Sequence, residues 1–351
     1  EADTFSFNIT GFGAGFDVDA TQLADLTLLR QTPGVIDATT SNSTPLSNGG
    51  WSSGINLQPN QKTSTADSTF YIVDSHAINT YGVNLVAGRD FKPEEIESLT
   101  FGDAIRPKVI IVTQALADKL FPDGDALGKQ VYLDEKPPSS AIIGIVERLQ
   151  QPWVDSDTID NSTFIPAYMP YGDSTRYLVR TEPGRRDAVI REVERSLGES
   201  NRGRIIGKML TLEDMRKEAY AGDRAMSIIL GIVIIALLAI TALGILGMAS
   251  FWVAQRTRQI GTRRALGATR TDILRYFQTE NFIITSFGLL LGAVLAYGFS
   301  LWLMSRYRSP KLPWHYVPVG FVCLWVLGQL AVLGPALRAS RVPPAVATRS
   351  V

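Results

Sequence analysis

The residues with the clearest chemical potential form a run of arginines between positions 256 and 280. The run contains Arg256, Arg258, Arg263, Arg264, Arg270 and Arg275. Guanidinium groups bind phosphates, carboxylates and lipid head groups. The whole chain nevertheless carries 34 Lys+Arg against 34 Asp+Glu. A protein dedicated to nucleic acid would carry a broad basic excess, and we therefore expect no nucleic-acid partner.

Residues that ligate metals or act as nucleophiles are scarce in this sequence. The chain has two histidines, His76 and His315, and one cysteine, Cys323, which lies in an apolar run. A single cysteine excludes a disulfide within the chain and a thiolate metal cluster. Two isolated histidines predict neither a metal site nor a base paired with a nucleophilic serine. We expect no catalytic residue, no metal site and no enzyme activity on this chain.

Two glycine-rich segments resemble nucleotide-binding loops. GDALGK at 124–129 is shorter than a phosphate-binding loop, and Gln130 stands where Ser or Thr should hold magnesium. A helical segment precedes it, whereas a phosphate-binding loop follows a strand. GFGAG at 11–15 lacks the spacing of a dinucleotide fingerprint. Neither segment is expected to bind a cofactor.

Three apolar segments are long enough to cross a bilayer, which takes roughly 20 residues. They are residues 226–253, 281–304 and 317–337. The third is the weakest because it contains Gln329 and two prolines, although membrane helices tolerate proline. In the second, Gly288, Gly292 and Ala296 recur every four residues, a spacing that lets helices pack closely. We predict a transmembrane helical bundle in which this stripe is a packing face.

The basic residues orient these helices, because short loops rich in Lys and Arg stay in the cytoplasm. The segment at 254–280 and the tail at 338–351 are both basic and are predicted to be cytoplasmic. The loop at 305–316 and residues 1–225 then lie outside. A large domain outside is usually carried across by an earlier span. We therefore expect a further helix before residue 1, which makes four native spans where three are visible.

Residues 1–225 have the pattern of a soluble α+β domain. Alternating or short apolar runs predict strands that include 5–10, 162–169, 176–181 and 204–210. Helical spacing predicts helices at 21–31 and 184–199, the second with Val189, Val193 and Leu197 on one face. Strand–helix–strand at each end predicts a split α/β sandwich. The residues from about 50 to 140 would form an inserted subdomain.

Helices are also predicted on both sides of the first apolar run. Thr211 and Asp214 form a capping box, and the helix at 211–225 is expected to continue into the membrane as a stalk that transmits force. After the run, 254–266 has a helical pattern that Gly267 can end in the left-handed conformation. Thr269 and Asp272 form a second capping box. The segment 254–280 is therefore predicted to be an elbow of two helices.

Two explanations fit the basic surface of this elbow. The arginines can bind the anionic head groups of membrane lipid, as they do in many cytoplasmic loops. That accounts for the charge, but not for the apolar Ile260, Ala265 and Leu266 between the arginines. A mixed apolar and basic surface suits the docking of a protein. Charge and spacing alone leave both explanations open.

The segment 254–280 resembles the signature of the MacB/FtsX-type permeases of ABC transporters. In that family an R-x-x-x-I-G-x-x-R-A-x-G-A segment follows the second membrane helix, and a Glu opens the third. The matching residues are Arg256, Ile260, Gly261, Arg264, Ala265, Gly267, Ala268 and Glu280. The tail resembles the family's closing segment, with Thr348 in place of the usual Leu. Residues 81–91 and 109–133 resemble the MacB periplasmic core domain.

The resemblance implies a multi-pass permease of the bacterial inner membrane with its large domain in the periplasm. Such permeases work as dimers, of identical or related chains. An ABC ATPase, on the same chain or separate, binds ATP and magnesium and docks under the elbow. The predicted ATPase-coupling residues are Arg256, Arg258, Ile260, Gly261, Arg263, Arg264, Ala265, Leu266, Gly267 and Ala268.

The family implies more than one activity. The leading expectation is efflux of a drug, peptide or other substrate, with a periplasmic adaptor and an outer-membrane channel as partners. One alternative is lipoprotein release. Another is an FtsX-type transducer that regulates cell-wall hydrolases, although its outside domain is typically smaller. A membrane-anchored enzyme fits less well, because no catalytic constellation is apparent.

Overall fold

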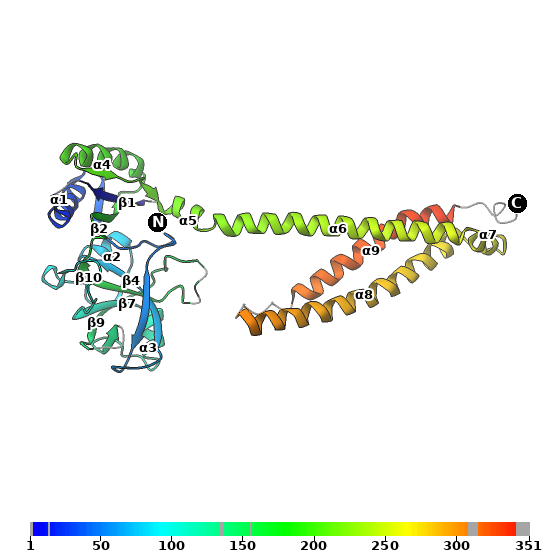
Figure 1. The fold of residues 1–351 in the computed structure, drawn as a ribbon, viewed down its shortest axis with the longest axis horizontal. Coiled ribbons are helices and arrows are strands. Elements are labelled where there is room, and N and C mark those ends of the chain that lie inside the picture. Colours follow the sequence, from blue (N-terminus) through cyan, green and yellow to red (C-terminus); the bar gives the residue numbers. More distant parts are fainter. Residues whose placement is uncertain are drawn as a thin grey trace. The chain divides into compact units, whose positions relative to one another are not determined.

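The computed structural model describes residues 3–12, 15–133, 137–154, 156, 158–307 and 315–341. The chain divides into two compact units, Glu1–Arg224 and Ala225–Val351 (Figure 1). Most of the predicted 305–316 loop and of the 338–351 tail, including Thr348, lies outside the described residues. Each unit is built around its own apolar clusters.

The first unit contains an α/β sandwich made from both ends of its sequence. Its strands are β1 (Thr4–Gly11), β2 (Val35–Thr40), β11 (Ser174–Thr181), β12 (Arg204–Ile206) and β13 (Leu210–Thr211). They form a sheet in the order β12-β1-β11-β2, with β13 also paired to β1. Helices α1 (Val18–Gln31) and α4 (Arg186–Ser200) pack on the face that carries Phe5, Phe7 and Ile9 (Figure 1). The predicted split sandwich is confirmed.

Local sequence signals set the limits of these helices. The side chain of Asp17 caps α1 by accepting a hydrogen bond from the backbone N–H of Ala20 at 2.9 Å. The chain turns after α1 at Gly34, whose φ of +94° is in the left-handed region that favours glycine. In α4, the predicted apolar face of Val189, Val193 and Leu197 is buried against the sheet, because these positions recur every four residues.

The inserted subdomain has its own sheet and helices. Its strands are β3 (Trp51–Asn56), β4 (Ala66–Val73), β5 (Leu85–Gly88), β6 (Glu97–Ser98), β7 (Val109–Thr113), β8 (Gln130–Leu133), β9 (Ser140–Val146) and β10 (Ser162–Tyr168). Its helices are α2 (Ala77–Tyr81), the 3-10 turn η1 (Pro93–Glu95) and α3 (Gln114–Leu120). The strand order is β4-β3-β8-β9-β7-β10-β6, and β4 also pairs with β10. That pairing closes the hydrogen-bonded strands into a ring.

The insertion is longer than the predicted 50–140. It runs from β3 to β10, because the strand at 162–168 pairs with β4 and β7 rather than joining the sandwich. The side chains of β10 from Ser162 to Ala167 are buried, including Phe164 on one face and Ile165 on the other. A strand buried on both faces belongs in the interior of a sheet, which is where β10 lies.

A polar cluster joins the sandwich to the inserted subdomain. Arg30 of α1 forms an ion pair with Asp74, whose carboxylate also accepts a hydrogen bond from Thr39 Oγ1 at 2.7 Å. Asp37 of β2 lies 2.9 Å from His76 Nδ1 and accepts a bond from Asn79 at 2.7 Å. His76 is thus part of a structural network at this junction.

A buried ion pair lies inside the sandwich. Arg204 Nη1 donates to both carboxylate oxygens of Asp25, and the two side chains are 1% and 4% exposed. The hydroxyl of Tyr177 donates to the same carboxylate at 3.1 Å. Burial raises the pKa of Asp25 above its ordinary value, although Arg204 and Tyr177 oppose this shift. The pair links α1 to β12 and the end of α4.

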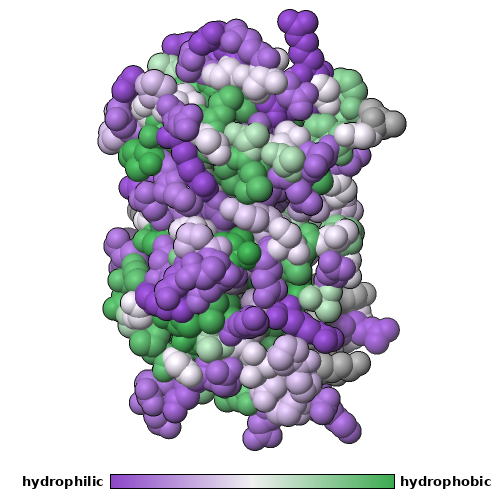
Figure 2. Space-filling view, turned by 90° about the vertical axis from the view of Figure 1, so that its left-hand side faces the viewer, coloured by the Kyte–Doolittle hydropathy of each residue, from purple (hydrophilic) through white to green (hydrophobic). Residues whose placement is uncertain are grey.

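The second unit consists of helices with apolar surfaces. They are α6 (Ala221–Gln255), α7 (Thr257–Ala265), α8 (Arg270–Tyr307) and α9 (Tyr316–Ser340). Among the described residues, α6, α8 and α9 lie in the three helices that are long and apolar enough to cross a membrane. Large side chains on them, such as Ile235 and Phe287, are about 70% exposed. In contrast, polar side chains cover much of the first unit in Figure 2. The predicted apolar helices are confirmed.

The predicted stalk helix continues into the first apolar run through a turn at Tyr220. Its capping box is confirmed, since Asp214 N donates to Thr211 Oγ1 at 3.1 Å and Thr211 N donates to Asp214 Oδ2 at 3.3 Å. However, α5 (Leu212–Ala219) ends one residue before α6 begins. The N–H of Tyr220 bonds to the carbonyls of Arg216 and Glu218, which tightens the last turn. The helical hydrogen bonds nevertheless continue through this turn, from Tyr220 N to the carbonyl of Arg216 at 3.2 Å and from Arg224 N to the carbonyl of Tyr220 at 2.9 Å. Residues Leu212–Gln255 therefore form one helical path into the first apolar run, as predicted, and the transmission of force along it stays a prediction.

Candidate functional site

The basic stretch folds into the predicted elbow. The helix α6 ends at Gln255, α7 runs to Ala265, and α8 begins at Arg270. Gly267 has a φ of +102°, so the turn after α7 takes the left-handed conformation. Thr269 N donates to Asp272 Oδ2 at 2.9 Å, and Asp272 N donates to Thr269 Oγ1 at 3.3 Å. The predicted glycine turn and capping box are confirmed.

One side of the elbow is packed into the second unit. Ile260 and Gly261 are buried. Ile260 belongs to a cluster with Ile273 and Phe277 of α8, and with Val332, Ala336 and Ala339 of α9. Side chains at this spacing on facing helices exclude water and fix the helices against each other. Ile260 and Gly261 therefore position the elbow and present no surface to a partner.

Two arginines are held against α8. Arg256 Nη1 lies 3.0 Å from Glu280 Oε1 and 3.2 Å from the hydroxyl of Tyr276. Arg263 lies over the ring of Tyr276, at 4.7 Å from its centroid, where the π face attracts a cation. Glu280, matched to the family signature in the sequence, is thus the partner of Arg256. These contacts fix the arginines on one side of the elbow.

The remaining predicted coupling residues divide between the exposed side and the packed side of the elbow. Arg258, Ala265 and Gly267 are exposed, whereas Arg264 and Ala268 are half-buried. Leu266 at the tip is 83% exposed. A large apolar side chain that a defined turn leaves exposed, and that cations flank, is suited to a pocket on a protein partner. We call Arg258, Ala265, Leu266 and Gly267 the elbow tip.

Replacing Glu280 by Gln is expected to loosen α7 from α8. The pair with Arg256 is partly exposed, so its contribution is about 0.5–1 kcal/mol, or a two- to five-fold change in local opening. Limited trypsin digestion should then cleave after the α7 arginines two to five times faster. Thr279→Ala, which changes an exposed neighbour, is the control. Equal cleavage of both variants and the wild-type chain would contradict this contact.

The predicted packing stripe does not pack within the described chain. A Cβ atom added at Gly288 or Gly292 meets no atom within 4 Å, and Ala296 is exposed. The contact between α8 and α9 instead uses Asn281, which donates to the carbonyl of Gly328 at 3.1 Å. Close approach there is possible because Gly328 has no side chain. The stripe does not form the contact between α8 and α9, and its packing role stays a prediction.

The glycine-rich segment at 124–129 is a turn that follows α3 and leads into β8. A phosphate-binding loop instead leads from a strand into a helix, whose N-terminus faces the phosphate. Lys129 forms an ion pair with Asp125 at 3.2 Å. Within the described residues, no group of three or more His, Cys, Asp and Glu side chains is placed to hold a metal.

Tyr276 and Asn281 were not identified from the sequence. Tyr276 contacts Arg256 and Arg263, which precede it by 20 and 13 residues, so no local spacing signals the contact. Asn281 offered a clearer signal, because a polar amide at the start of an apolar helix needs a hydrogen-bond partner. Its partner, however, lies on another helix.

These features define a class: membrane proteins in which a small helical bundle, with a basic elbow, is joined to a large α+β domain. The family model for the MacB-like periplasmic core domain matches residues 3–196, and the model for the FtsX-like permease C-terminal region matches residues 231–344. The chain belongs to the MacB/FtsX-type ABC transporter permeases. The elbow lies within the matched permease region.

Individual proteins in this family are distant relatives. The macrolide export ATP-binding/permease protein MacB of Chromobacterium violaceum is 24% identical over 280 residues, which are 75% of this chain and 40% of that protein. The ABC transporter permease YvrN of Bacillus subtilis is 23% identical over 292 residues, 80% of this chain and 69% of that protein. The crystal structure of the periplasmic region of MacB from Actinobacillus actinomycetemcomitans is 14% identical, with a TM-score of 0.36 over 57% of this chain and 87% of that one.

Proposed function

We propose that this chain is the membrane permease part of a MacB-type exporter in the bacterial inner membrane, with its first unit in the periplasm. ATP hydrolysis on a cytoplasmic ABC ATPase would move the helices and, through them, the periplasmic domain. The energy source, ATP with magnesium, would bind to the ATPase and not to this chain. The chain would act as a mechanical coupler without a catalytic site of its own.

The observation that carries this proposal is the geometry of the elbow. Buried Ile260 and the Arg256–Glu280 pair hold α7 against its neighbours. The same geometry leaves Leu266 at the tip 83% exposed. Binding of lipid head groups requires only the cations. A fixed apolar tip with cations beside it favours docking into a protein pocket, because interface energy is concentrated in a few buried anchors.

The other proposed partners follow from the family. A second permease, identical or related, would complete a dimer, and the exposed face of Gly288, Gly292 and Ala296 is a suitable surface for close helix contact. Relatives are named for export of macrolides and of pyoverdine. Export of a drug, peptide or similar small compound is therefore the preferred activity. A periplasmic adaptor and an outer-membrane channel would carry the compound onward.

The test is affinity purification of the full-length protein in mild detergent, followed by mass spectrometry of the proteins recovered with it. We expect an ABC ATPase, on the same polypeptide or beside it, together with a periplasmic adaptor. Recovery of lipoproteins or of a cell-wall hydrolase in place of an adaptor would replace export with lipoprotein release or signal transduction. Absence of any ATPase would overturn the coupling role and leave the elbow as a lipid-binding loop.

A further inference from the structure

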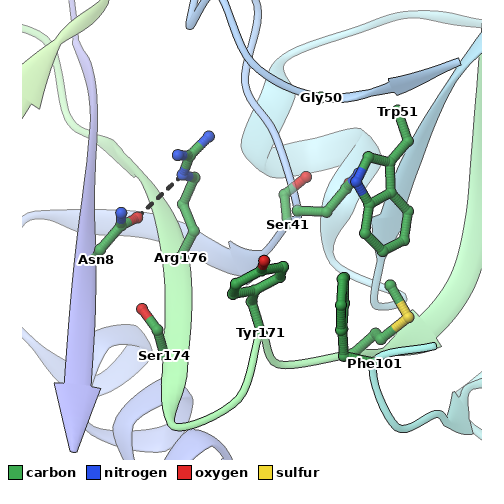
Figure 3. A pocket seen from close by; sticks show the side chains of 10 residues that line it. Asn8, Ser41, Gly50, Trp51, Phe101, Tyr171, Ser174 and Arg176 are labelled. Carbon is green, nitrogen blue, oxygen red and sulfur yellow. Dashed lines mark hydrogen bonds between the residues drawn. The ribbon is translucent and has the colours of Figure 1, made fainter.

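A cavity lies in the first unit between the sandwich sheet and the inserted subdomain. Its volume is about 260 Å³. The sandwich contributes Asn8 of β1 and Arg176 of β11, and the inserted subdomain contributes Trp51 and Phe101 (Figure 3). For comparison, a dry cavity of about 150 Å³ can hold benzene. This cavity therefore has room for a small bicyclic molecule.

One wall of the cavity is aromatic. The rings of Phe101 and Tyr171 meet edge to face at 4.2 Å between centroids, and Trp51 lies 5.5 Å from Phe101. Phe101 is 45% exposed and Tyr171 is 66% exposed, so neither belongs to a core. Tyr171 is held by a tight turn in which it exchanges backbone hydrogen bonds with Ser174. A rigid row of exposed rings offers flat contact area at low entropic cost.

The opposite wall carries a charge without a counterion. Arg176 is half-buried and directly opposite Asn8 in the sheet, and its Nε donates to Asn8 Oδ1 at 3.0 Å. None of the ion pairs between described residues involves this guanidinium. Burial lowers the pKa of Arg176. A partly buried arginine is stabilised by an anion that accepts hydrogen bonds from its planar guanidinium group.

The same arginine lines a second cavity, of about 400 Å³, together with Asn8. Charged residues that line it are Arg176, Lys208 and Glu218. In the first cavity, Arg176 is the one charged residue among the described lining residues. The two cavities share Asn8 and Arg176, so both are complementary to a negative group placed at the arginine.

We propose that the first cavity binds a small amphipathic carboxylate, with its flat apolar part against Trp51, Phe101 and Tyr171 and its carboxylate on Arg176. The aromatic wall contributes apolar contact, and the arginine selects the charge. A carboxylate matches the guanidinium fork with two parallel hydrogen bonds. The proposal concerns binding by the outside domain and does not depend on the proposed export.

The test is isothermal titration of the full chain in detergent with 2-naphthoate and with its neutral analogue 2-naphthamide. We expect naphthoate to bind at one site per chain and naphthamide to bind at least tenfold more weakly. Arg176→Met should abolish the difference between the two ligands, and Tyr171→Ala should weaken both several-fold. Arg195→Met, which changes an exposed arginine of α4, is the control. A given ligand partitions into detergent to the same extent whichever variant is present, so a difference in its affinity between variants reports on the site.

Three results would overturn the proposal. They are no saturable binding of naphthoate to the wild-type chain, equal affinities for naphthoate and naphthamide, and unchanged affinities in Arg176→Met. If Arg176→Met fails to fold, the comparison of the two ligands on the wild-type chain still decides the role of charge. Tyr171 lies in an exposed turn, so Tyr171→Ala is expected to fold. Its affinities for the two ligands then test the role of the aromatic wall.

Discussion

Arg204→Met is expected to lower the free energy of unfolding of the first unit by about 3–5 kcal/mol at neutral pH. The substitution removes the guanidinium but leaves the Asp25 carboxylate, which is 4% exposed, without its counterion. Because 1.4 kcal/mol is a factor of ten, native-state hydrogen exchange of β1 and β11 should accelerate about 100-fold or more. Arg195→Met, which removes exposed pairs on α4, should change this exchange less than about five-fold.

The loss of unfolding free energy in Arg204→Met should be smaller at acidic pH than at neutral pH. Burial already raises the pKa of Asp25 above its ordinary 3.8, and Arg204 opposes that rise. Without Arg204 the pKa rises further, so the folded state binds a proton more tightly than the unfolded state does. Stability from such a group is present below the unfolded pKa and is lost as pH rises through the folded pKa. The variant should therefore differ from the wild-type chain less at pH 5 than at pH 8.

A second substitution separates charge from packing. Asp25→Asn in the Arg204→Met background removes the buried charge but keeps an oxygen that can accept the Tyr177 hydroxyl. It should recover most of the stability, because replacing both members of a buried pair costs less than removing one. If the double variant is no more stable than Arg204→Met, the loss arises from packing and not from the unpaired carboxylate.

Leu266→Asp is expected to reduce recovery of the proposed partner ATPase with this protein by at least tenfold, and to reduce the stimulated ATP hydrolysis of that ATPase by at least tenfold. An anchor side chain that fills a partner pocket typically contributes 2 kcal/mol or more, and a carboxylate in the same pocket would be desolvated. Leu266 is 83% exposed, so the change leaves the packing of the elbow intact. The ATPase rate of the reconstituted complex measures the effect.

Two companion variants make this result specific. Leu266→Met conserves volume and apolarity, and should retain most of the coupling. Gly267→Val should impair coupling through the backbone, because a β-branched residue is strained at a φ of +102°. Normal coupling in both Leu266→Asp and Gly267→Val would contradict the docking role of the elbow tip.

Features encoded by neighbouring residues were predictable from the sequence. The capping boxes at Thr211 and Thr269, the turn at Gly267 and the buried face of α4 depend on spacings of three or four residues, which single-chain patterns display. The three apolar helices follow from length and composition alone. The two helices of the elbow can be predicted from these signals because none of them depends on a tertiary contact.

Features that depend on distant partners were not predictable in the same way. The sequence predicts a strand at 162–169, but a short apolar run does not specify which sheet the strand joins. Its pairing with β4 depends on residues more than 90 positions away. Likewise, no local spacing indicates the contact between Asn281 of α8 and Gly328 of α9, because the two residues are 47 positions apart. The cavity at Arg176 combines distant strands and loops, and no motif marks it.

The long separation between β1 and β11 has a consequence for the order of folding. Asn8 pairs with Arg176, 168 residues later, and the whole inserted subdomain lies between them. Contacts this distant are entropically costly to close and slow to form. The insertion, whose strands pair with one another, can fold first and bring the ends of β2 and β11 together. Until it does, β1 is an unpaired apolar strand, and this period is when the domain is most prone to aggregate.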